Sequence, residues 1–307
     1  MQPDLGILLV AHGTPTTLED IPAFLNNIRR GRPTPPDVVQ AVRARYEAIG
    51  GASPLLKTTR AQAKLLEERT GLPSFVATRM WSPTFREVLH ELSEAKHPRE
   101  LIVVSAAPHS AHVYAQALQA TADELAAQGV DVPVLHPGPC WGANPSFIRA
   151  WAKATARELD RLGVRRAARA VLVTTAHSLP MRTVQAGDPY PRLVAETSQA
   201  VVEALGQAAL PSMLAFQSQG MSSEPWLGPD LPTVFERAKN TGAEGVLIVP
   251  VGFPAEHVET LYDLDIEAVD IAKEAGLWLE RIPCLDTDSG LIEALADVVQ
   301  QVRSDLR

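Results

Sequence analysis

Eight apolar runs of strand length, each separated from the next by sequence of helix length, constrain the fold of this chain more than any other feature. Four runs lie in each half, at 6–11, 74–79, 101–106, 132–136, 170–175, 212–217, 246–251 and 277–281. Strands that alternate with helices are typical of parallel sheets with right-handed crossover connections. The sequence therefore predicts the α/β class, with two similar doubly wound domains, each a four-stranded parallel sheet flanked by helices.

The two halves repeat one another in detail, which indicates how the domains are divided. The first strand of each half leads into Ala-His-x-x-Pro, at 11–15 and at 176–180. The third strands share an apolar run, a proline and a His-Val pair, in 101–113 and 246–258. We interpret the repeat as duplication of a doubly wound half, with chance similarity between α/β units as the alternative. The expected domains are 1–160 and 170–307, with an active-site cleft between them.

The segment from about 18 to 56 is longer than a plain crossover requires. Its prolines and its Gly-Gly pair divide it into helix, turn, helix and a second turn, which favours a lid over the cleft. The basic cluster IRRGR at 28–32 suits an anionic small molecule. The polar side chains of this lid that we expect to contact a ligand are Arg29, Arg30, Arg45 and Ser53.

A histidine and a file of carboxylates follow two strands of the second half. His177 comes just past the strand at 170–175, and the strand at 246–251 runs through a Gly-Phe-Pro turn into a helix. That helix carries Glu259, Asp263 and Glu267, and carboxylates four residues apart lie near one helical face. Like charges at this spacing cost a few tenths of a kcal/mol, so the file either handles cations or protons or lies on a solvated surface.

Ligands of parallel sheets bind at the carboxyl ends of the strands. We therefore expect His177 to face the carboxylates, with a hydrogen-bonded structural histidine as the alternative. Trp226 lies in a loop rich in proline and glycine, where it is either a core anchor or a stacking platform for a flat ligand.

Composition and missing motifs exclude several functions. The net charge of −8 without a long Lys/Arg run argues against nucleic-acid binding, and no apolar stretch reaches membrane-spanning length. Cys140 and Cys284 lack the spacing of a disulfide framework, a zinc site or an iron–sulfur site, which favours a reducing cytoplasm. GxxxxGK, HExxH and GxSxG motifs are absent, as is GxGxxG after the first strand. The remaining chemistry uses imidazole, carboxylates and a cation, with a flat or anionic partner.

A set of motifs along the whole chain resembles ferrochelatase, the class II chelatase that inserts ferrous iron into a porphyrin in haem biosynthesis. The motifs are LLVAHGTP at 8–15, IRRGRPTP at 28–35, RYEAIGGASPL at 45–55, APH at 107–109, TAHSLP at 175–180, GDPYP at 187–191, QSQG at 217–220, PWLGPD at 225–230 and VPVGFPAEHVETLYDLDIE at 249–267. Their order and spacing together are specific, although no single motif would suffice.

The resemblance implies roles for the residues of the second half. His177 and Glu259 match the catalytic histidine and glutamate, which are also candidate metal ligands. Asp263 and Glu267 match the acids that continue the proton or metal path along a helix that is partly π-type in the family. Trp226 matches a wall of the porphyrin cleft.

In the lid, Arg29, Arg45 and Ser53 resemble the anchors of the porphyrin propionates, and Arg30 belongs to the same cluster. The IRRGR and YEAIGG motifs look like those of compact bacterial enzymes that metallate coproporphyrin III, so we expect this porphyrin to be favoured over protoporphyrin IX. The resemblance implies a cytoplasmic monomer with no required cofactor, because Fe²⁺ is a substrate. We expect no iron–sulfur cluster, because the cysteine-bearing C-terminal extension that carries it in part of the family is not seen in this sequence. The acidic helix is a candidate site for an accessory Mg²⁺.

Two positions depart from the family pattern. Many coproporphyrin-type members have tyrosine where this chain has His12, which either binds the metal or merely fills space. A second family tyrosine corresponds to Leu118, with Tyr114 one turn earlier, so one propionate contact is in doubt. Two other functions stay open: a chelatase for cobalt, nickel or sirohydrochlorin, and a tetrapyrrole carrier without catalysis.

Overall fold

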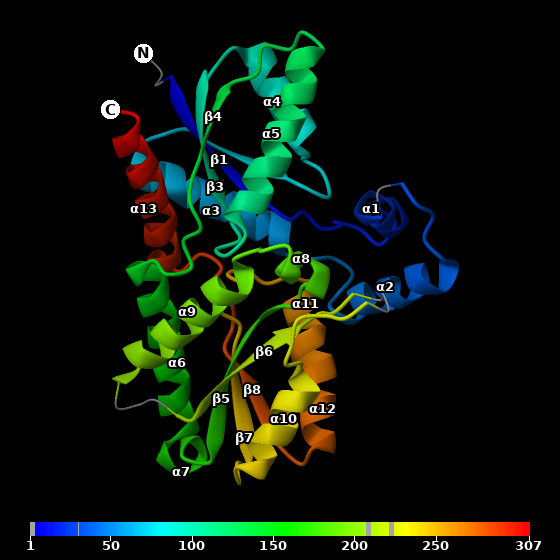
Figure 1. The fold of residues 1–307 in the computed structure, drawn as a ribbon, viewed down its shortest axis with the longest axis vertical. Helices are drawn as coiled ribbons and strands as arrows, with labels where there is room; N and C mark the ends of the chain where they lie inside the picture. The colour runs from blue at the N-terminus through cyan, green and yellow to red at the C-terminus, as the bar shows by residue number, and fades with distance from the viewer. Residues whose placement is uncertain (1–3, 30, 207–209, 221–223) are drawn as a thin grey trace. The chain divides into compact units, whose positions relative to one another are not determined.

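A computed structural model of the protein describes residues 4–29, 31–206, 210–220 and 224–307. The chain divides into two compact units. Unit 1 comprises Met1–Trp141 and Leu291–Arg307, and unit 2 comprises Gly142–Gly290. Each unit is an α/β layer structure with its own parallel sheet, so the expected fold class is confirmed (Figure 1).

The strands begin and end close to the expected apolar runs. In unit 1 they are β1 (Leu5–Ala11), β2 (Ser74–Thr78), β3 (Glu100–Ser105) and β4 (Val134–Pro137). In unit 2 they are β5 (Ala170–His177), β6 (Ser212–Gln217), β7 (Gly245–Val249) and β8 (Trp278–Arg281).

Helices connect the strands and cover the sheets. Unit 1 has α1 (Ile21–Ile28), α2 (Pro36–Ala48), α3 (Leu55–Thr70), α4 (Phe85–Ala95), α5 (Ala111–Ala127) and most of α13 (Ser289–Asp305). Unit 2 has α6 (Pro145–Leu162), α7 (Val164–Ala167), α8 (Met181–Gln185), α9 (Tyr190–Ala204), α10 (Leu231–Asn240), α11 (Val258–Leu261), the π-helix η2 (Asp263–Glu267) and α12 (Ala268–Glu274).

The two sheets have the same strand order, β2-β1-β3-β4 and β6-β5-β7-β8, with every pair parallel. The order reverses direction at β1 in unit 1 and at β5 in unit 2. In open α/β sheets the ligand site lies outside the carboxyl ends of the strands at such a switch point. The fold therefore predicts that residues following β1, β5 and β7 contribute to a ligand site.

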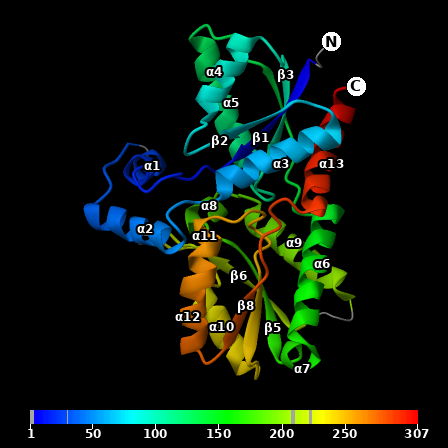
Figure 2. The same ribbon diagram turned by 180° about the vertical axis from the view of Figure 1, so that it is seen from behind.

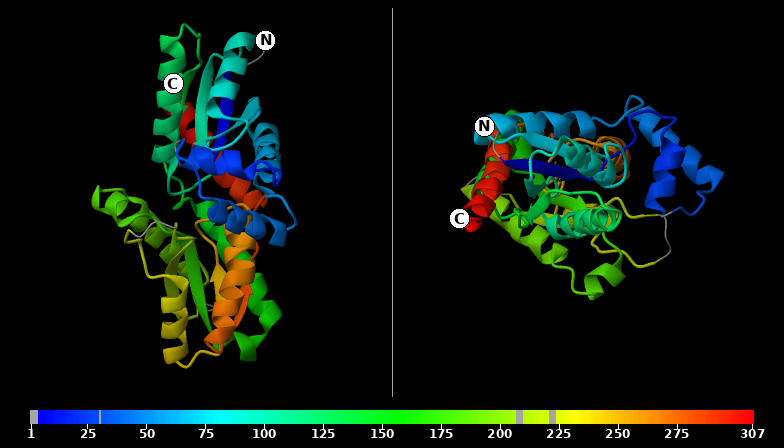
Figure 3. Two further views of the ribbon diagram at one scale, coloured as in Figure 1. Left: turned by 90° about the vertical axis from the view of Figure 1, so that its right-hand side faces the viewer. Right: turned by 90° about the horizontal axis from the view of Figure 1, so that it is seen from above.

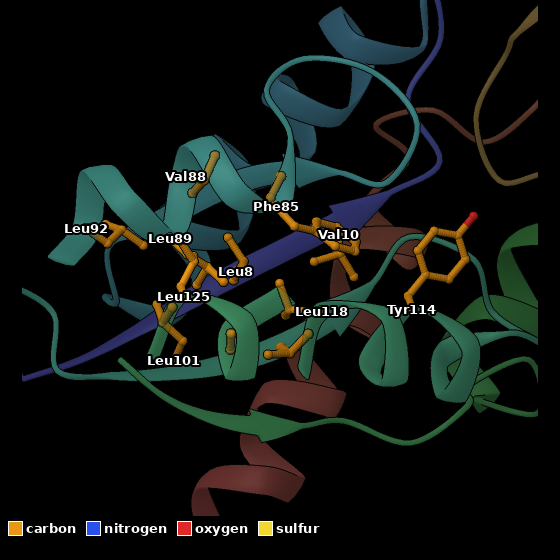
Figure 4. Packing of buried hydrophobic residues seen from close by; sticks show 13 residues of the cluster. Leu8, Val10, Phe85, Val88, Leu89, Leu92, Leu101, Tyr114, Leu118 and Leu125 are labelled. Atoms are coloured by element: carbon orange, nitrogen blue, oxygen red, sulfur yellow. The ribbon is translucent and has the colours of Figure 1, made fainter. Parts of the chain in front are cut away.

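The sheet of unit 1 is buried on both faces because its central strands are apolar along almost their whole length, in β1 and at 101–104 of β3. Leu8 and Val10 of β1 pack against α4 and α5 in one apolar cluster (Figure 4). Ile7 and Leu9 are equally buried but point to the opposite face, which α3 and α13 cover (Figure 2). At about 25 cal/mol per Å² of apolar surface removed from water, this burial is the main stabilising term of the unit.

Unit 2 follows the same plan. Val171 and Val173 of β5 face α10, α12 and the π-helix, whereas Ala176 faces α9. Because strand side chains alternate between faces, His177 shares the face of Val171 and Val173. The strand period thus directs the His177 side chain toward the helices that carry the acids.

The division of the chain differs from the expected boundaries of 1–160 and 170–307 in two places. Helix α6 packs beside α9 and belongs to unit 2, although most of it precedes residue 160. Helix α13 belongs to unit 1, where Glu293 forms two hydrogen bonds with Arg69 of α3, at 2.8 and 2.9 Å. The periodicity of a helix shows that it has a buried stripe but does not show which sheet it covers.

The insertion expected at about 18–56 forms α1 and α2, and the next helix begins at Leu55 (Figure 3). Two contacts tie α1 to the loop after β2: the Phe24 and Trp81 rings meet edge-on at 6.2 Å, and Asn27 Nδ2 donates to the Met80 carbonyl at 3.1 Å. A lid function for this insertion, and the cleft expected between the domains, stay predictions.

Candidate active site

His177 is the last residue of β5, which extends two residues beyond the expected run at 170–175. His177 therefore lies within the strand and not just past its end, as we expected. The ring donates Nδ1–H to the Ser178 carbonyl, which can only accept, so this bond fixes the proton at Nδ1. The Tyr190 hydroxyl donates to the His177 carbonyl at 2.9 Å and holds the backbone. Nε2 is left to face the acids, and it lies 3.5 Å from Oε1 of Glu259.

Glu259 lies between two imidazoles. His177 is at one carboxylate oxygen, and Nε2 of His257 lies 3.3 Å from the other oxygen, Oε2. The opposite nitrogen of His257 donates to the Ala255 carbonyl at 3.1 Å, so its ring orientation is also fixed. This arrangement confirms that His177 and Glu259 meet, and it adds His257 to the site.

The pair perturbs the pKa values of both partners. Burial by itself lowers the pKa of His177, but the Glu259 carboxylate, helped by the Ser178 carbonyl and by Asp263, raises it to about 9. Burial by itself raises the pKa of Glu259, but His177 and His257 hold it well below its ordinary value. At neutral pH the resting pair is therefore an imidazolium and a carboxylate. The pair binds one proton, which lies on His177, and each partner affects the titration of the other.

Asp263 is the second acid of the file and is almost fully buried, with 4% of its surface exposed. The Ser218 hydroxyl donates to its Oδ2 at 2.5 Å. The neighbouring Gln217 donates from Nε2 to the Glu259 carbonyl at 2.8 Å. Two consecutive residues at the end of β6 thus fix two successive acids of the adjoining helix.

The acids lie on a helix that changes its winding. Residues 258–261 are α-helical and residues 263–267 form a π-helix, as the family resemblance implied. The wider π turn reduces the drift of side chains spaced four apart, and π segments are frequent at functional sites. Because Asp263 is buried and Glu267 is exposed, the file leads from the interior to the solvent. We refer to residues 256–267 as the acid segment.

Trp226 lies beside the segment that follows His177, and backbone contacts join the two. Residues 180 and 226 form an antiparallel bridge, and the Leu227 amide donates to the Leu179 carbonyl at 2.8 Å. The ring lies directly on Gly220, where an added Cβ would be 2.7 Å from it. Trp226 is half-buried, so part of the ring surface remains available.

The site residues expected in the first half all lie in unit 1. His12 follows β1 and is exposed, and the Tyr114 hydroxyl lies 3.5 Å from its Nδ1. Tyr114 stands at one end of the apolar cluster with its hydroxyl pointing away from it (Figure 4). Leu118 is fully buried in that cluster, so it contacts no ligand and does not replace the family tyrosine.

The residues expected to form the lid's ligand contacts lie at α1, in α2 and in the turn before α3. Arg29 is the C-cap of α1, Arg45 is in the last turn of α2, and Ser53 accepts a hydrogen bond of 3.3 Å from the Leu55 amide. Within the part of the chain that the structure describes, the buried Nε of Arg29 has no hydrogen-bond partner. Arg30 lies outside the described residues. Joint binding of one ligand by these residues and His177 stays a prediction.

Sequence reasoning did not assign roles to His257, Gln217 and Ser218. The spacing His-x-Glu was a usable signal, because it places a second imidazole two residues before Glu259. Gln217 and Ser218 lie in the QSQG motif, but nothing in the sequence pairs them with acids more than forty residues away.

Among residues 4–29, 31–206, 210–220 and 224–307, no group of three or more His, Cys, Asp or Glu side chains is arranged to hold a metal ion. Across the same residues, no helix has both the length and the apolarity that a membrane crossing demands.

Comparison with known proteins places the chain in a family. The coproporphyrin III ferrochelatase of Geobacillus thermodenitrificans is 34% identical over 96% of this chain and 95% of its own length. The corresponding enzyme of Geobacillus kaustophilus is 35% identical, over 96% and 94%. The ferrochelatase of Thermus thermophilus is 34% identical, over 96% and 98%.

Solved structures give the same fold at lower identity. SirB from Bacillus subtilis with Fe³⁺ matches with a TM-score of 0.57 and 14% identity, over 100% of this chain and 97% of that one. The cobalt complex of the sirohydrochlorin chelatase SirB from the spizizenii subspecies has the same TM-score, at 11% identity and over 99% and 97%. The sequence profile of the ferrochelatase family matches residues 4–303. The chain belongs to the ferrochelatase family, and it is an enzyme of metal insertion in haem biosynthesis.

Proposed function

We propose that the protein inserts ferrous iron into a free-base porphyrin, and that it favours coproporphyrin III over protoporphyrin IX. The observation that carries the proposal is the His177–Glu259 pair at the carboxyl end of β5, with Nε2 and Oε1 3.5 Å apart. A carrier that only binds tetrapyrroles has no need of a base whose pKa is tuned by a neighbouring acid.

The chemistry requires a base and a destination for protons. A free-base porphyrin carries two N–H protons in its plane, and both must leave when a divalent metal ion binds the four nitrogens. Neutral imidazole accepts such a proton at Nε2, and the Glu259 carboxylate stabilises the imidazolium that results. His177 must therefore first release the proton that the resting pair holds.

The remaining acids give that proton a route. Asp263 is buried beside the pair, and its charge already contributes to the raised pKa of His177. Glu267 is exposed at the far end of the acid segment. Proton release along this file, or movement of a hydrated metal ion in the opposite direction, uses the same carboxylates. An accessory Mg²⁺ at these acids belongs to the same proposal.

The preference for coproporphyrin III rests on anion binding in unit 1. Coproporphyrin III has four propionates, whereas protoporphyrin IX has two. Arg29 and Arg45 are proposed propionate contacts because guanidinium groups bind carboxylates through paired hydrogen bonds. The buried Arg29 Nε without a partner among the described residues is a donor of the kind that a bound carboxylate would satisfy. Ser53 and Arg30 are proposed to assist, Trp226 to contact the macrocycle, and His12 to contact the metal.

The test is an anaerobic insertion assay with ferrous iron and either porphyrin, followed by the visible spectrum. We expect the four bands of free-base coproporphyrin III to collapse to two, and His177→Ala to abolish the change. Sirohydrochlorin with cobalt is the competing substrate, chosen because SirB shares the fold. Wild-type protein that binds coproporphyrin III but metallates it with neither iron nor zinc would contradict the proposal.

We also propose that the protein is a monomer and that it works in the cytoplasm.

A further inference from the structure

Arg281 is a buried cation that the proposed chemistry does not use. It is the last residue of β8, and only 8% of its side-chain surface is exposed. Its charge is balanced by two carboxylates, Glu256 and Asp265. Burial by itself lowers the pKa of Arg281, but hydrogen bonds and the charges of these acids raise it, so the guanidinium is always charged.

The first acid stands at the beginning of the acid segment. Arg281 Nη1 donates to Glu256 Oε1 at 2.8 Å, and the Cys284 amide donates to the same oxygen at 2.9 Å. The other oxygen, Oε2, accepts from the Thr260 hydroxyl at 2.6 Å. That hydroxyl in turn accepts from the His257 amide at 3.0 Å. The carboxylate of Glu256 therefore ties the turn that presents Glu259 to the end of β8.

The second acid stands in the π-helix. Arg281 donates from Nε to Asp265 Oδ1 at 2.5 Å and from Nη2 to Oδ2 at 2.6 Å, which is the two-pronged geometry of a guanidinium on a carboxylate. One planar group thus grips the acid segment on both sides of Glu259 and Asp263. Lysine has a single point of charge and cannot reproduce both contacts.

We propose that Arg281 is a positioning residue: by holding the acid segment at Glu256 and at Asp265, it keeps Glu259 opposite His177. The consequence for catalysis rests on the proposed function, because the readout is metal insertion. A general stabilising role predicts something different, namely a loss of activity that only follows the loss of folded protein.

The experiment compares Arg281→Lys and Arg281→Ala with wild type, using zinc and coproporphyrin III as the probes. For Arg281→Lys we expect kcat to fall on the order of tenfold to a hundredfold, as for an acid displaced by about 1 Å. The KM for the porphyrin should stay within about twofold, because the residues proposed to bind propionates lie on other elements. Circular dichroism at the assay temperature gives the folded fraction of each variant, and the kcat of that variant is divided by this fraction.

Rescue by guanidinium ion separates positioning from simple stabilisation. Arg281→Ala leaves two carboxylates around a space shaped for a guanidinium group, so millimolar guanidinium should restore part of kcat. The matched control is Arg169→Ala, which removes an exposed arginine paired with Glu244 in the same unit. We expect it to keep wild-type kcat and to show no response to guanidinium.

The outcomes are distinct. If wild type inserts neither zinc nor, without oxygen, ferrous iron, the proposed function fails and the role of Arg281 is not at issue. If wild type is active and Arg281→Lys matches it per folded molecule, the positioning role is wrong. Should Arg281→Ala not fold, Asp265→Asn weakens the same grip from the other side, and an unchanged kcat in that variant would equally overturn the inference.

Discussion

The Ser218 hydroxyl donates a hydrogen bond of 2.5 Å to Asp263 from a backbone with φ of 59°, a left-handed conformation that non-glycine residues rarely adopt. Such a conformation costs about 1–2 kcal/mol. The fold accepts this cost and in return fixes a buried carboxylate next to Glu259. Strained residues of this kind gather at functional sites.

Ser218→Gly separates the strain from the hydrogen bond. Glycine relieves the backbone strain, so we expect the free energy of unfolding in urea to stay within about 1 kcal/mol of wild type. The insertion rate should fall on the order of tenfold because Asp263 loses its donor. The control is Lys96→Gly, another left-handed residue, at the end of α4, which should leave the rate unchanged. An unimpaired Ser218→Gly enzyme would show that Asp263 needs no fixing.

Glu259→Gln removes the charge opposite His177 while keeping the side-chain shape. Of the effects that oppose burial, only the Ser178 carbonyl and Asp263 then remain, so we expect the pKa of His177 to fall well below its wild-type value of about 9. The measurement is an NMR titration of the imidazole signals. Insertion should slow by about 10²–10⁴-fold, whereas porphyrin affinity from fluorescence quenching should be retained. A His177 pKa that stays near 9 would mean that Glu259 is not the cause.

Insertion should be faster in alkaline than in neutral solution. The imidazole must be neutral to accept a pyrrole proton, and its raised pKa keeps it protonated at pH 7. We therefore expect kcat to rise with pH and to level off near pH 9. A series of rates with zinc at saturating porphyrin checks this, and a profile that is flat between pH 6 and 9 would contradict it.

The His177–Glu259 pair also makes stability depend on pH. The folded pKa of His177 lies above its unfolded value, so its contribution is complete below about pH 6.5 and is lost as the pH rises through about 9. For Glu259 the folded pKa lies below the ordinary 4.5, so its contribution is present above that value and lost as the pH falls. Urea unfolding at pH 6 and pH 10 should show wild type and Glu259→Gln becoming more alike at pH 10.

The contribution of Trp226 to porphyrin binding can be tested at Gly220, which its ring contacts. At Gly220 a Cβ would lie 2.7 Å from the indole, so Gly220→Ala must push the ring aside. If the ring contacts the macrocycle, the Kd for coproporphyrin III should rise on the order of tenfold. Gly228→Ala in the same loop adds a Cβ at an ordinary 3.6 Å contact and serves as the control. Equal affinities for the two variants would remove Trp226 from the porphyrin site.

Sequence alone predicted the parts of this protein that depend on local pattern. Apolar runs located the strands, and the rule that ligands lie beyond strand ends singled out His177 and Glu259. It did not reveal Ser218 or Arg281, because they contact acids 45 and 16 residues away, and no period or motif encodes such pairs. Likewise Leu118 was aligned with a family tyrosine, but only the packing showed that it belongs to the apolar core.

Unit 1 takes its last helix from the far end of the chain, whereas unit 2 is one continuous stretch. During synthesis on the ribosome, unit 2 can therefore finish folding while the sheet of unit 1 still lacks α13. Until residues 291–307 emerge, the apolar surface that α13 covers stays open to chaperones and to aggregation. A stop codon near residue 290 would spare every proposed catalytic side chain. It would still leave unit 1, which contains the N-terminal part of the chain, without the helix that covers one face of its sheet.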